Sequence, residues 1–565
     1  MTSCQKDDAL VLRPAEDVMR LSALGASFPH RLSFKRTLIR QLHQQNAKMT
    51  VIDNSLDENG YGMMALSIPF HGRIYTLIAY SRALADEDRT DRVIATAWDA
   101  SFCLFDGVPN ADDMANLSDQ VTHQEFGKYH EKVMTLSRAN KSVRLFSHVV
   151  DALAKGQQPD IEQLAKIGYL MRTTAVYGNG KFGIADRDVI KDYDGLNAPF
   201  RAEMLTVYLI REFTFQLVNH LARQKGGTDA TSLSPALSRH LGVGNSTGLG
   251  MAPFLVHHPN LLNSWVMVRE TALAMVRQTD SLSLQEQELY IALGQRIADH
   301  LRQWQVDDAN YQVIIADLII RWDALCADLP ALLKQHRPLD KIMLEAQNQG
   351  DDFAALAASF VMEYQGPLID ELEECMTEAR APALEPAMVI DDLQKLIEKH
   401  YRWALAIDLC KPQSRQQFWY VSEEKLEPRL GNAYAEDGQE REMPFAMAFY
   451  LADLQKVMAD KPANMTVAEL LMAHPECRYI IRRIQNNAHF PYAEIQGNLV
   501  GEECRPIDLL RFKLSFFGAS KFDPRSDRWT RITLFQGAPS AGELSDKTAD
   551  DWSFWVIDGF AGCQS

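Results

Sequence analysis

Hydrophobic and polar residues alternate with the period of a β-strand in the first part of the chain. The segments 49–53, 63–70 and 73–81 are short, rich in β-branched or aromatic residues and separated by turn residues, which predicts antiparallel strands. A segment with helical spacing, 32–45, precedes them. We therefore predict an N-terminal α+β domain over residues 1–155.

The hydrophobic period becomes helical in the middle of the chain. From residue 159 to about 409 almost no segment alternates like a strand, so we predict a helical domain over residues 156–409 without a parallel sheet. Residues 201–224 are apolar on most faces, which is typical of a helix buried on several sides. Arg211 and Glu212 lie in this segment. Buried charges are normally paired, so we expect each to have a partner and to cost about 3–5 kcal/mol when truncated.

The last part of the chain returns to a mixed pattern. Segments 417–422, 529–536 and 552–557 are predicted strands, joined by long turn-rich connections, in a second small α+β domain over residues 410–565. The charged segment 422–442 is long for a loop and is either functional or mobile. The predicted fold class is α+β multidomain, mainly α, with a central helical domain flanked by two smaller domains that contain antiparallel strands.

Composition narrows the class of protein and its partners. The 565 residues are 46% hydrophobic and 24% charged, which is typical of a globular protein with several cores. The net charge of −17 argues against nucleic acid and anionic membranes as partners, because both require a basic face. We find no signal peptide and no apolar run long enough to span a bilayer, so we expect a cytoplasmic protein. The eight cysteines are scattered without metal-ligand spacing and are expected to be reduced.

Two glycine-rich loops carry the strongest functional signal. They are YGNGKFG at residues 177–183 and GVGNSTGLGMAP at residues 242–253. Glycine permits positive φ and lets a ligand approach the backbone, whose N–H groups can bind an anion. We therefore expect a small polar ligand at these loops. The expected substrate-binding residues are Arg172, Tyr177, Asn179, Asn245, Ser246 and Thr247.

Known nucleotide motifs do not account for the two loops. The first loop matches the GxGxxG pattern, but the residues after it are too polar for the packed helix of a dinucleotide-binding unit. The second loop lacks the GK[ST] ending of a phosphate-binding P-loop. The alternative that both loops are only turns between helices stays open.

Candidate acid–base groups come from three segments. His257 and His258 are adjacent, and the chain has no helical HxxxH spacing, so a metal site is not predicted. The stretch RRIQNNAHFPY, residues 482–492, has the composition of a site-lining loop. Desolvation lowers the pKa of a lysine, which would suit Lys181 as a base. The expected catalytic residues are Lys181, His489 and Tyr492, and the two loops are expected to meet in one pocket with the 482–492 segment.

The segment STGLGMAP, residues 246–253, resembles the Gly/Ser-rich, Met-Pro-containing loop of the fumarase and aspartase superfamily, whose members are also long and helical. The lysine and asparagine that should follow Met-Pro are absent or displaced in this sequence. The mixed segments at both ends also depart from that superfamily. The resemblance therefore covers one loop and assigns no family.

The favoured hypothesis is a cytoplasmic enzyme of small-molecule metabolism that binds an anionic substrate, with a carboxylate or a phosphate, at the glycine loops. Proton-transfer chemistry of the lyase or isomerase type is favoured because it needs no cofactor motif. The cofactor is left unknown and a homo-oligomer is left open. The alternative is a helical scaffold, or a ligand-sensing regulatory protein without turnover.

Overall fold

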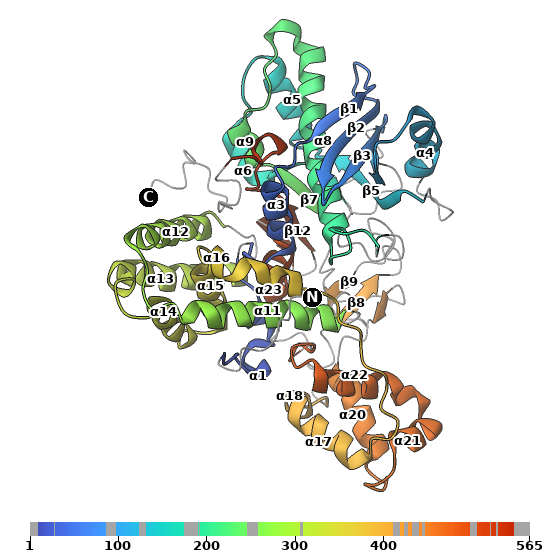
Figure 1. Ribbon diagram of the computed structural model, residues 1–565, viewed down its shortest axis with the longest axis vertical. Helices are drawn as coiled ribbons and strands as arrows, with labels where there is room; N and C mark the ends of the chain where they lie inside the picture. The colour runs from blue at the N-terminus through green and yellow to red at the C-terminus, as the bar shows by residue number, and fades with distance from the viewer. Residues whose placement is uncertain are drawn as a thin grey trace. The chain divides into compact units, whose positions relative to one another are not determined.

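The structure is a computed structural model of the whole chain. It describes residues 10–27, 29–85, 98–123, 131–173, 190, 192–245, 258–304, 309–410, 418–422, 428–431, 440–442, 447–497, 506–519, 521–526 and 529–546. These residues form a mixed α+β structure that is mainly α-helical (Figure 1), which confirms the coarse fold class.

The chain divides into two compact units, each assembled from separate segments of the sequence. Unit 1 comprises Met1–Ala26, Leu249–Ile291 and Ala324–Lys513, and unit 2 comprises Ser27–Gly248, Ala292–Asp323 and Leu514–Ser565. Three of the five boundaries fall within helices, namely α12 (Leu284–Gln303), α13 (Ala309–Leu332) and α23 (Pro506–Phe517). The three consecutive domains, 1–155, 156–409 and 410–565, stay a prediction.

Unit 2 is built on a nine-stranded sheet. In spatial order its strands are β1 (Thr50–Asn54), β2 (Gly62–Phe70), β3 (Arg73–Ser81), β4 (Ala100–Asp106), β5 (Val133–Lys141), β6 (Tyr169–Thr173), β7 (Gly242–Asn245), β12 (Trp529–Leu534) and β11 (Lys521–Ser526). The first three strands match the strands predicted at 49–53, 63–70 and 73–81. They pair antiparallel, with Ser67 opposite Thr76 and the two buried hydroxyls 2.7 Å apart.

The central strands of this sheet correct the expected middle domain. β6 and β7 pair parallel, with Arg172 opposite Gly244, whereas all other neighbours in the sheet pair antiparallel. Both strands lie within residues 156–409, so the expectation of no parallel strands there is wrong. The reason is their length: five and four residues are too few for a period-2 pattern to be recognised.

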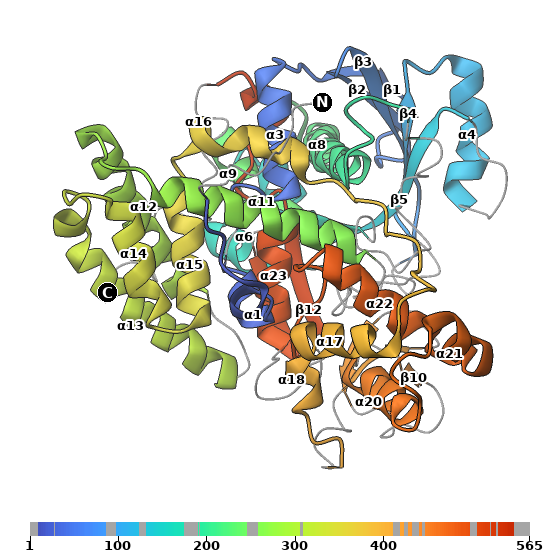
Figure 2. The same cartoon turned by 60° about the horizontal axis from the view of Figure 1, so that its bottom comes forward.

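The helix α8 (Arg201–Gly226) lies in the connection between β6 and β7 and packs along the sheet. It contacts every strand from β2 to β7, and also α3 (Phe34–Gln44) and α5 (Phe146–Ala154). Figure 1 shows α8 along the strands, and Figure 2 shows it nearly end-on beside them. Its side chains are buried on all faces, and the Phe213 ring meets the Phe102 ring of β4 edge-on, with centroids 5.4 Å apart. Residues 201–224 are therefore a core helix, as predicted.

Shorter helices complete unit 2. The helix α4 (Ala111–His123) covers β3 and β4 over a cluster that includes Ile78, Cys103 and Phe105. Before β6, α6 (Ile161–Ile167) begins where the Asp160 side chain accepts the backbone N–H of Gln163. It ends at Gly168, whose φ of 76° turns the chain into β6. Before β7 lies α9 (Pro235–Arg239).

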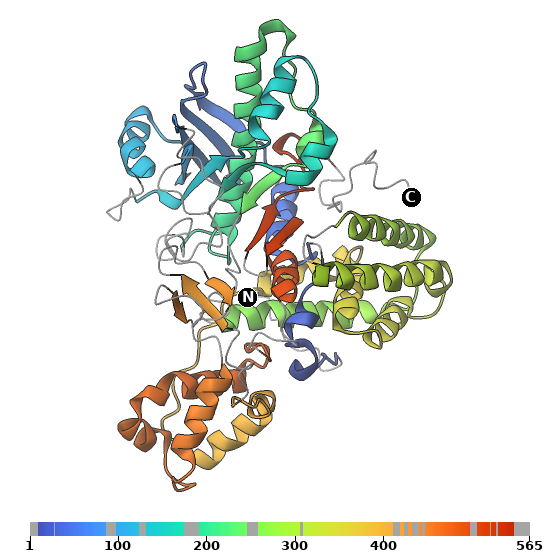
Figure 3. The same ribbon diagram turned by 180° about the vertical axis from the view of Figure 1, so that it is seen from behind.

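Unit 1 is mostly helical and contains two helical groups. In the first group, α11 (Pro259–Arg277), α14 (Pro338–Gln347) and α15 (Asp351–Met362) pack on one another and on α2 (Leu21–Leu24) and α16 (Gly366–Ile369), and α1 (Ala15–Val18) adjoins α2. The second group, which Figure 3 shows in orange and yellow, comprises α17 (Ile390–His400), α18 (Arg402–Leu405), α20 (Met447–Met458), α21 (Val467–Ala473) and α22 (Arg478–His489). Its helices enclose an apolar core that includes Ile397, Leu451 and Ile481.

Unit 1 also holds a small antiparallel sheet in the order β10 (Glu440–Glu442), β8 (Phe418–Ser422) and β9 (Pro428–Gly431). The strands β8 and β12 match the strands predicted at 417–422 and 529–536. The strand predicted at 552–557 lies outside the described residues. The described parts of the charged segment 422–442 contribute β9 and β10.

Every helix in the described part of the chain is too short or too polar to cross a bilayer. Cys103, Cys326, Cys410 and Cys477 are not disulfide-bonded. Cys375 takes part in a disulfide, so the expectation of reduced cysteines is wrong for this residue.

Candidate functional site

Four of the six residues predicted to bind substrate, and the predicted catalytic Lys181, lie outside the part of the chain that the structure describes. These are Tyr177, Asn179, Lys181, Ser246 and Thr247. Their roles stay predictions.

Arg172 and Asn245 lie on the two strands that lead into the glycine loops. Arg172 is on β6 with 8% of its surface exposed, and Asn245 is the last residue of β7. Because β6 and β7 are parallel neighbours, both strands end at the same edge of the sheet. That edge is where ligands bind in parallel sheets. The geometry of the strands is therefore compatible with loops that meet, which stays a prediction.

Two glycines of the second loop have a packing reason to be glycine. A Cβ on Gly242 would clash with the carbonyl oxygen of Leu534 on β12. A Cβ on Gly244 would lie 2.6 Å from the ring of Tyr169 on β6. These two positions therefore need glycine for the close approach of neighbouring strands, whether or not a ligand binds nearby.

His489 and Tyr492 lie in unit 1 and have structural contacts. His489 ends α22, about half exposed, with its ring Nε2 3.2 Å from a carboxylate oxygen of Glu385. Tyr492 is buried and its hydroxyl donates to the carbonyl oxygen of Arg13 at 2.7 Å. Burial and the Glu270 carboxylate raise the pKa of Tyr492 to about 12, with Arg13 and Arg269 opposing, which disfavours proton exchange near neutral pH.

His258 pairs through its ring Nδ1 with a carboxylate oxygen of Glu378 at 2.8 Å. Among the residues that the structure describes, no group of three or more histidine, cysteine or acidic side chains could hold a metal ion.

A pocket beside α8 is the strongest candidate site in unit 2. It has a volume of about 440 Å³ and is called the α8 pocket below. Its lining residues come from α8, from the segment before α9, from α9 itself and from residues 540–545. They are Lys48, Met49, Glu212, Phe215, Gln216, Asn219, Leu233, Pro235, Ser238, Ser540, Ala541, Gly542 and Ser545.

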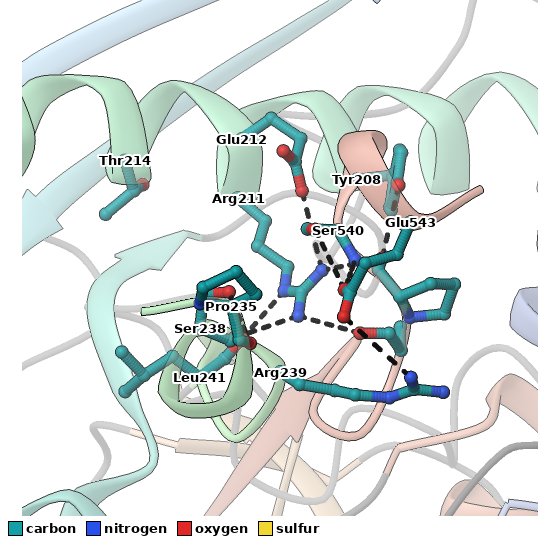
Figure 4. Close-up of polar contacts among 12 residues, drawn as sticks. Tyr208, Arg211, Glu212, Thr214, Pro235, Ser238, Arg239, Leu241, Ser540 and Glu543 are labelled. Carbon is teal, nitrogen blue, oxygen red and sulfur yellow. Dashed lines mark hydrogen bonds and ion pairs between the residues drawn. The ribbon is translucent and has the colours of Figure 1, made fainter. Parts of the chain in front are cut away.

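Glu212 is the acidic group of the α8 pocket. Its side chain is 5% exposed, and its carboxylate lies 3.5 Å from the Arg211 guanidinium (Figure 4). Burial raises the pKa of Glu212 to about 7, although Arg211 and the backbone N–H of Ala541 oppose this shift. The nearby Glu543 adds to the increase. Glu212 is therefore a carboxyl group that can hold or release a proton near neutral pH.

Arg211 holds two segments beside the α8 pocket in place through hydrogen bonds to their backbone. Its guanidinium donates to four backbone carbonyl oxygens, those of Leu241 at 2.7 Å, Ser238 at 3.0 Å, Ala538 at 2.9 Å and Pro539 at 3.0 Å. Figure 4 shows Arg211 pointing from α8 between these two segments. One buried side chain thus ties α8 to the end of α9 and to the segment after β12.

The segment after β12 is further ordered by its own contacts. Ser540 and Glu543 form a capping box, in which the Ser540 hydroxyl and backbone N–H both donate to the Glu543 carboxylate, at 2.8 and 2.7 Å. The Tyr208 hydroxyl donates to the Pro539 carbonyl oxygen at 3.2 Å. The part of the wall formed by residues 538–543 is therefore held by hydrogen bonds within the protein.

Sequence reasoning found Arg211 and Glu212 as buried charges but not the pocket. The serine and glutamate of the capping box, three residues apart, are a pattern that could have been recognised. Nothing in the sequence, however, brings residues 538–545 to α8. Comparisons with protein-family models, with curated proteins and with solved structures found no match.

Proposed function

We propose that this protein is an enzyme that binds a small polar molecule in the α8 pocket and transfers a proton to or from it through Glu212. The observation that carries the proposal is a buried carboxyl group, with a pKa of about 7, in the wall of a pocket. A general acid–base works best when its pKa lies near the operating pH. Raising a carboxyl pKa by burial is how enzymes obtain such a group.

The side chains around Glu212 determine which hydrogen-bonding groups a substrate needs. Glu212, Gln216 and Asn219 lie at spacings of four and three residues, on one stripe of α8. The Asn219 side-chain oxygen already accepts the backbone N–H of Leu233 at 2.9 Å, which leaves the side-chain NH₂ to donate. The Ser238 hydroxyl donates to the Pro235 carbonyl oxygen and is left as an acceptor. The Ser540 hydroxyl, in contrast, both donates to the Glu543 carboxylate and accepts the backbone N–H of Glu543. A substrate with both donor and acceptor groups, such as a hydroxylated molecule, satisfies this arrangement.

Lys48 supplies the positive charge at this pocket. It is exposed and is the one basic residue among the lining residues that the structure describes. A carboxylate or phosphate on the substrate would pair with Lys48 while another part of the molecule reaches Glu212. The proposal thus keeps the expected anionic substrate and the expected lyase or isomerase chemistry, and assigns them to residues other than those chosen from the sequence.

Proton transfer can be tested without knowing the substrate. We would incubate the protein with small hydroxy acids, oxo acids and sugar phosphates in D₂O and follow loss of the C–H signals by NMR. Glu212→Gln should reduce any exchange by about 10²–10⁴-fold, because it removes the acid–base group. Lys48→Gln should weaken binding of the exchanging compound, and the exposed Lys155→Gln should change nothing.

Two results distinguish a proton-transfer enzyme from a ligand-sensing protein. Exchange that survives Glu212→Gln would overturn the proposal. Binding in this pocket without exchange in any compound would favour the alternative, a ligand-sensing protein without turnover.

A second candidate is an anion site at the edge where β6 and β7 end. The specific observation in its favour is that both strands are parallel neighbours, run into the two glycine-rich segments, and carry the buried Arg172. It is tested by Arg172→Gln and Lys181→Ala. Both should abolish anion binding there and leave the α8 pocket unaffected.

A further inference from the structure

A second pocket lies in unit 1 at the start of α22. It has a volume of about 490 Å³, which is within the range of small-molecule sites, and is called the arginine pocket below. Its lining residues are Pro259, Ala381, Pro382, Pro475, Glu476, Arg478, Tyr479, Arg482, Arg483 and Asn486. From the 482–492 segment, which has the composition of a site-lining loop, Arg482, Arg483 and Asn486 line this pocket, whereas His489 and Tyr492 do not.

Two arginines of this pocket carry uncommitted positive charge. Arg483 is partly buried and pairs with Glu494, with its Nε 2.9 Å from the carboxylate. Arg478 and Arg482 are exposed, one helical turn apart, and neither forms an ion pair within the part of the chain that the structure describes. Their two charges match the charge of about −1.5 to −2 on a phosphate monoester at neutral pH.

Glu476 limits how much negative charge the pocket accepts. Its carboxylate lies 3.1 Å from the His474 ring, and its own backbone N–H and that ring keep the pKa of Glu476 below its ordinary value. Glu476 is therefore ionised and would repel a chain of phosphates. A single phosphate suits this pocket better than a triphosphate.

Asn486 supplies an acceptor at the inner wall. It is 7% exposed, and its amide NH₂ donates to the carbonyl oxygen of the Asn260 side chain at 2.8 Å. The Asn260 amide NH₂ in turn donates to the Ala379 carbonyl oxygen at 3.0 Å, so the orientation of both amides is set by the network. The Asn486 side-chain oxygen is then left buried without a hydrogen-bond donor in the described structure. A ligand N–H or O–H at this position would satisfy it.

The rest of the lining is largely apolar and contains the aromatic ring of Tyr479. Pro259, Pro382 and Pro475 contribute pyrrolidine rings, and Tyr479 is 41% exposed. Such surfaces bind planar apolar groups, and aromatic side chains stack on nucleobases. The pocket therefore combines a surface for a planar body, a hydrogen-bond acceptor and two cations.

We propose that the arginine pocket binds a nucleoside 5′-monophosphate whose base carries an exocyclic amino group. Arg478 and Arg482 bind the phosphate, the base lies against the proline and tyrosine rings, and the amino group donates to the Asn486 side-chain oxygen. The net charge of −17 disfavours a nucleic-acid polymer but not a mononucleotide at a local pair of arginines. This inference is independent of the function proposed for the α8 pocket.

The test is calorimetric titration of the full-length protein with AMP, IMP, adenosine and inorganic phosphate. AMP should bind, IMP should bind more weakly because it lacks the amino group, and adenosine more weakly because it lacks the phosphate. Arg478→Gln and Arg482→Gln should each weaken AMP binding about tenfold or more, the usual effect of losing a charge-assisted hydrogen bond. The matched control is Arg402→Gln, an exposed arginine of the same unit outside the pocket, which should leave binding unchanged.

Several outcomes would overturn the proposal. They are no AMP binding at millimolar concentration, AMP binding that both arginine variants leave intact, and equal binding of AMP and IMP. Inorganic phosphate binding as tightly as AMP would reduce the site to a simple anion site. Because Arg478 and Arg482 are exposed, both variants should keep the parent melting temperature, and this separates lost binding from lost folding.

Discussion

An adjacent arginine and glutamate lie buried in a long helix of each unit, and the two glutamates titrate in opposite directions. The pairs are Arg211 with Glu212 in α8, and Arg269 with Glu270 in α11. All four side chains are at most 5% exposed. Burial acts to raise the pKa of both carboxyl groups. The pKa of Glu212 is indeed raised, to about 7, whereas neighbouring charges bring the pKa of Glu270 below its ordinary value.

The difference comes from where the guanidinium N–H groups go. Arg269 donates two hydrogen bonds to the Glu270 carboxylate, at 2.9 and 2.7 Å, and Arg13 donates two more, at 2.7 and 2.9 Å. These charges outweigh the effect of burial on the Glu270 pKa. The Arg211 guanidinium instead donates to four backbone carbonyl oxygens, and its nearest approach to the Glu212 carboxylate is 3.5 Å.

Sequence neighbours in a helix do not by themselves form a strong ion pair. Residues i and i+1 point in different directions, so the contact depends on the third partner. At Glu270 the third partner is another arginine, and the cluster is structural. At Glu212 the third partner is the backbone N–H of Ala541, and the side chain lines the α8 pocket. The Glu212 carboxyl group therefore stays available for chemistry.

The largest expected effect is the loss of stability on neutralising Glu270. Glu270→Gln leaves Arg13 and Arg269 buried without a counter-charge, which should cost about 3–5 kcal/mol. Glu212→Gln, the matched control, should cost about 1 kcal/mol or less at pH 7, because the carboxyl is then partly neutral and Arg211 keeps its four carbonyl partners. Amide hydrogen exchange of α11 and α8 measures the two free energies of opening separately. Equal losses of opening free energy in α11 and α8 would show that the two Arg–Glu pairs do not differ in their contribution to stability.

The pH dependence of stability should differ between the two glutamates by an amount on the order of 3 kcal/mol. Glu212 has a folded pKa of about 7 against an ordinary value of 4.5. Between these values the unfolded chain has released the proton that the fold retains, so stability falls as pH rises from about 4.5 to about 7. Each pKa unit contributes about 1.4 kcal/mol.

Glu270 behaves in the opposite sense. Its folded pKa is lowered, so its stabilisation is fully present above the ordinary value and is lost only as pH falls through the folded pKa. Urea denaturation across pH 4.5–7 should therefore show a decline in the parent that Glu212→Gln removes and Glu270→Gln keeps. A decline that persists in Glu212→Gln would assign it to another group.

The smallest expected effect concerns Tyr492, which contacts the Glu270 cluster through Arg13. Tyr492→Phe removes the hydroxyl that donates to the Arg13 carbonyl oxygen and should cost about 1 kcal/mol. It should not change the D₂O exchange described above. Lost exchange with unchanged stability would instead restore the catalytic role assigned to Tyr492 from the sequence.

The hydrophobic pattern along the sequence predicted the helices and strands that bury a continuous apolar face. It did not predict contacts between residues that are far apart in the sequence. The core helix at 201–224 was predictable because its residues are apolar all round. The partners of Arg211 were not, because two of them, Ala538 and Pro539, are brought to α8 only by the fold. The α8 pocket depends on the same remote segment and was missed with it.

Glycine patterns gave an ambiguous signal for a physical reason. Gly242 and Gly244 look like ligand-loop residues in the sequence, but they also allow β6 and β12 to approach β7. Close backbone approach by a neighbouring strand and by a ligand select the same residue type. A glycine pattern alone therefore cannot separate the two causes, and only the neighbouring strands decide.

The position of β7 between β6 and β12 has a consequence for folding during synthesis. Residues 242–245 leave the ribosome long before residues 529–534, which must pair with them. Until then the sheet ends at β7, and its unpaired N–H and C=O groups can pair with another chain. Such long-range closure is slow and exposes the chain to aggregation. Nascent chains stopped before residue 529 should therefore depend on chaperones, whereas release of the last strands closes the sheet.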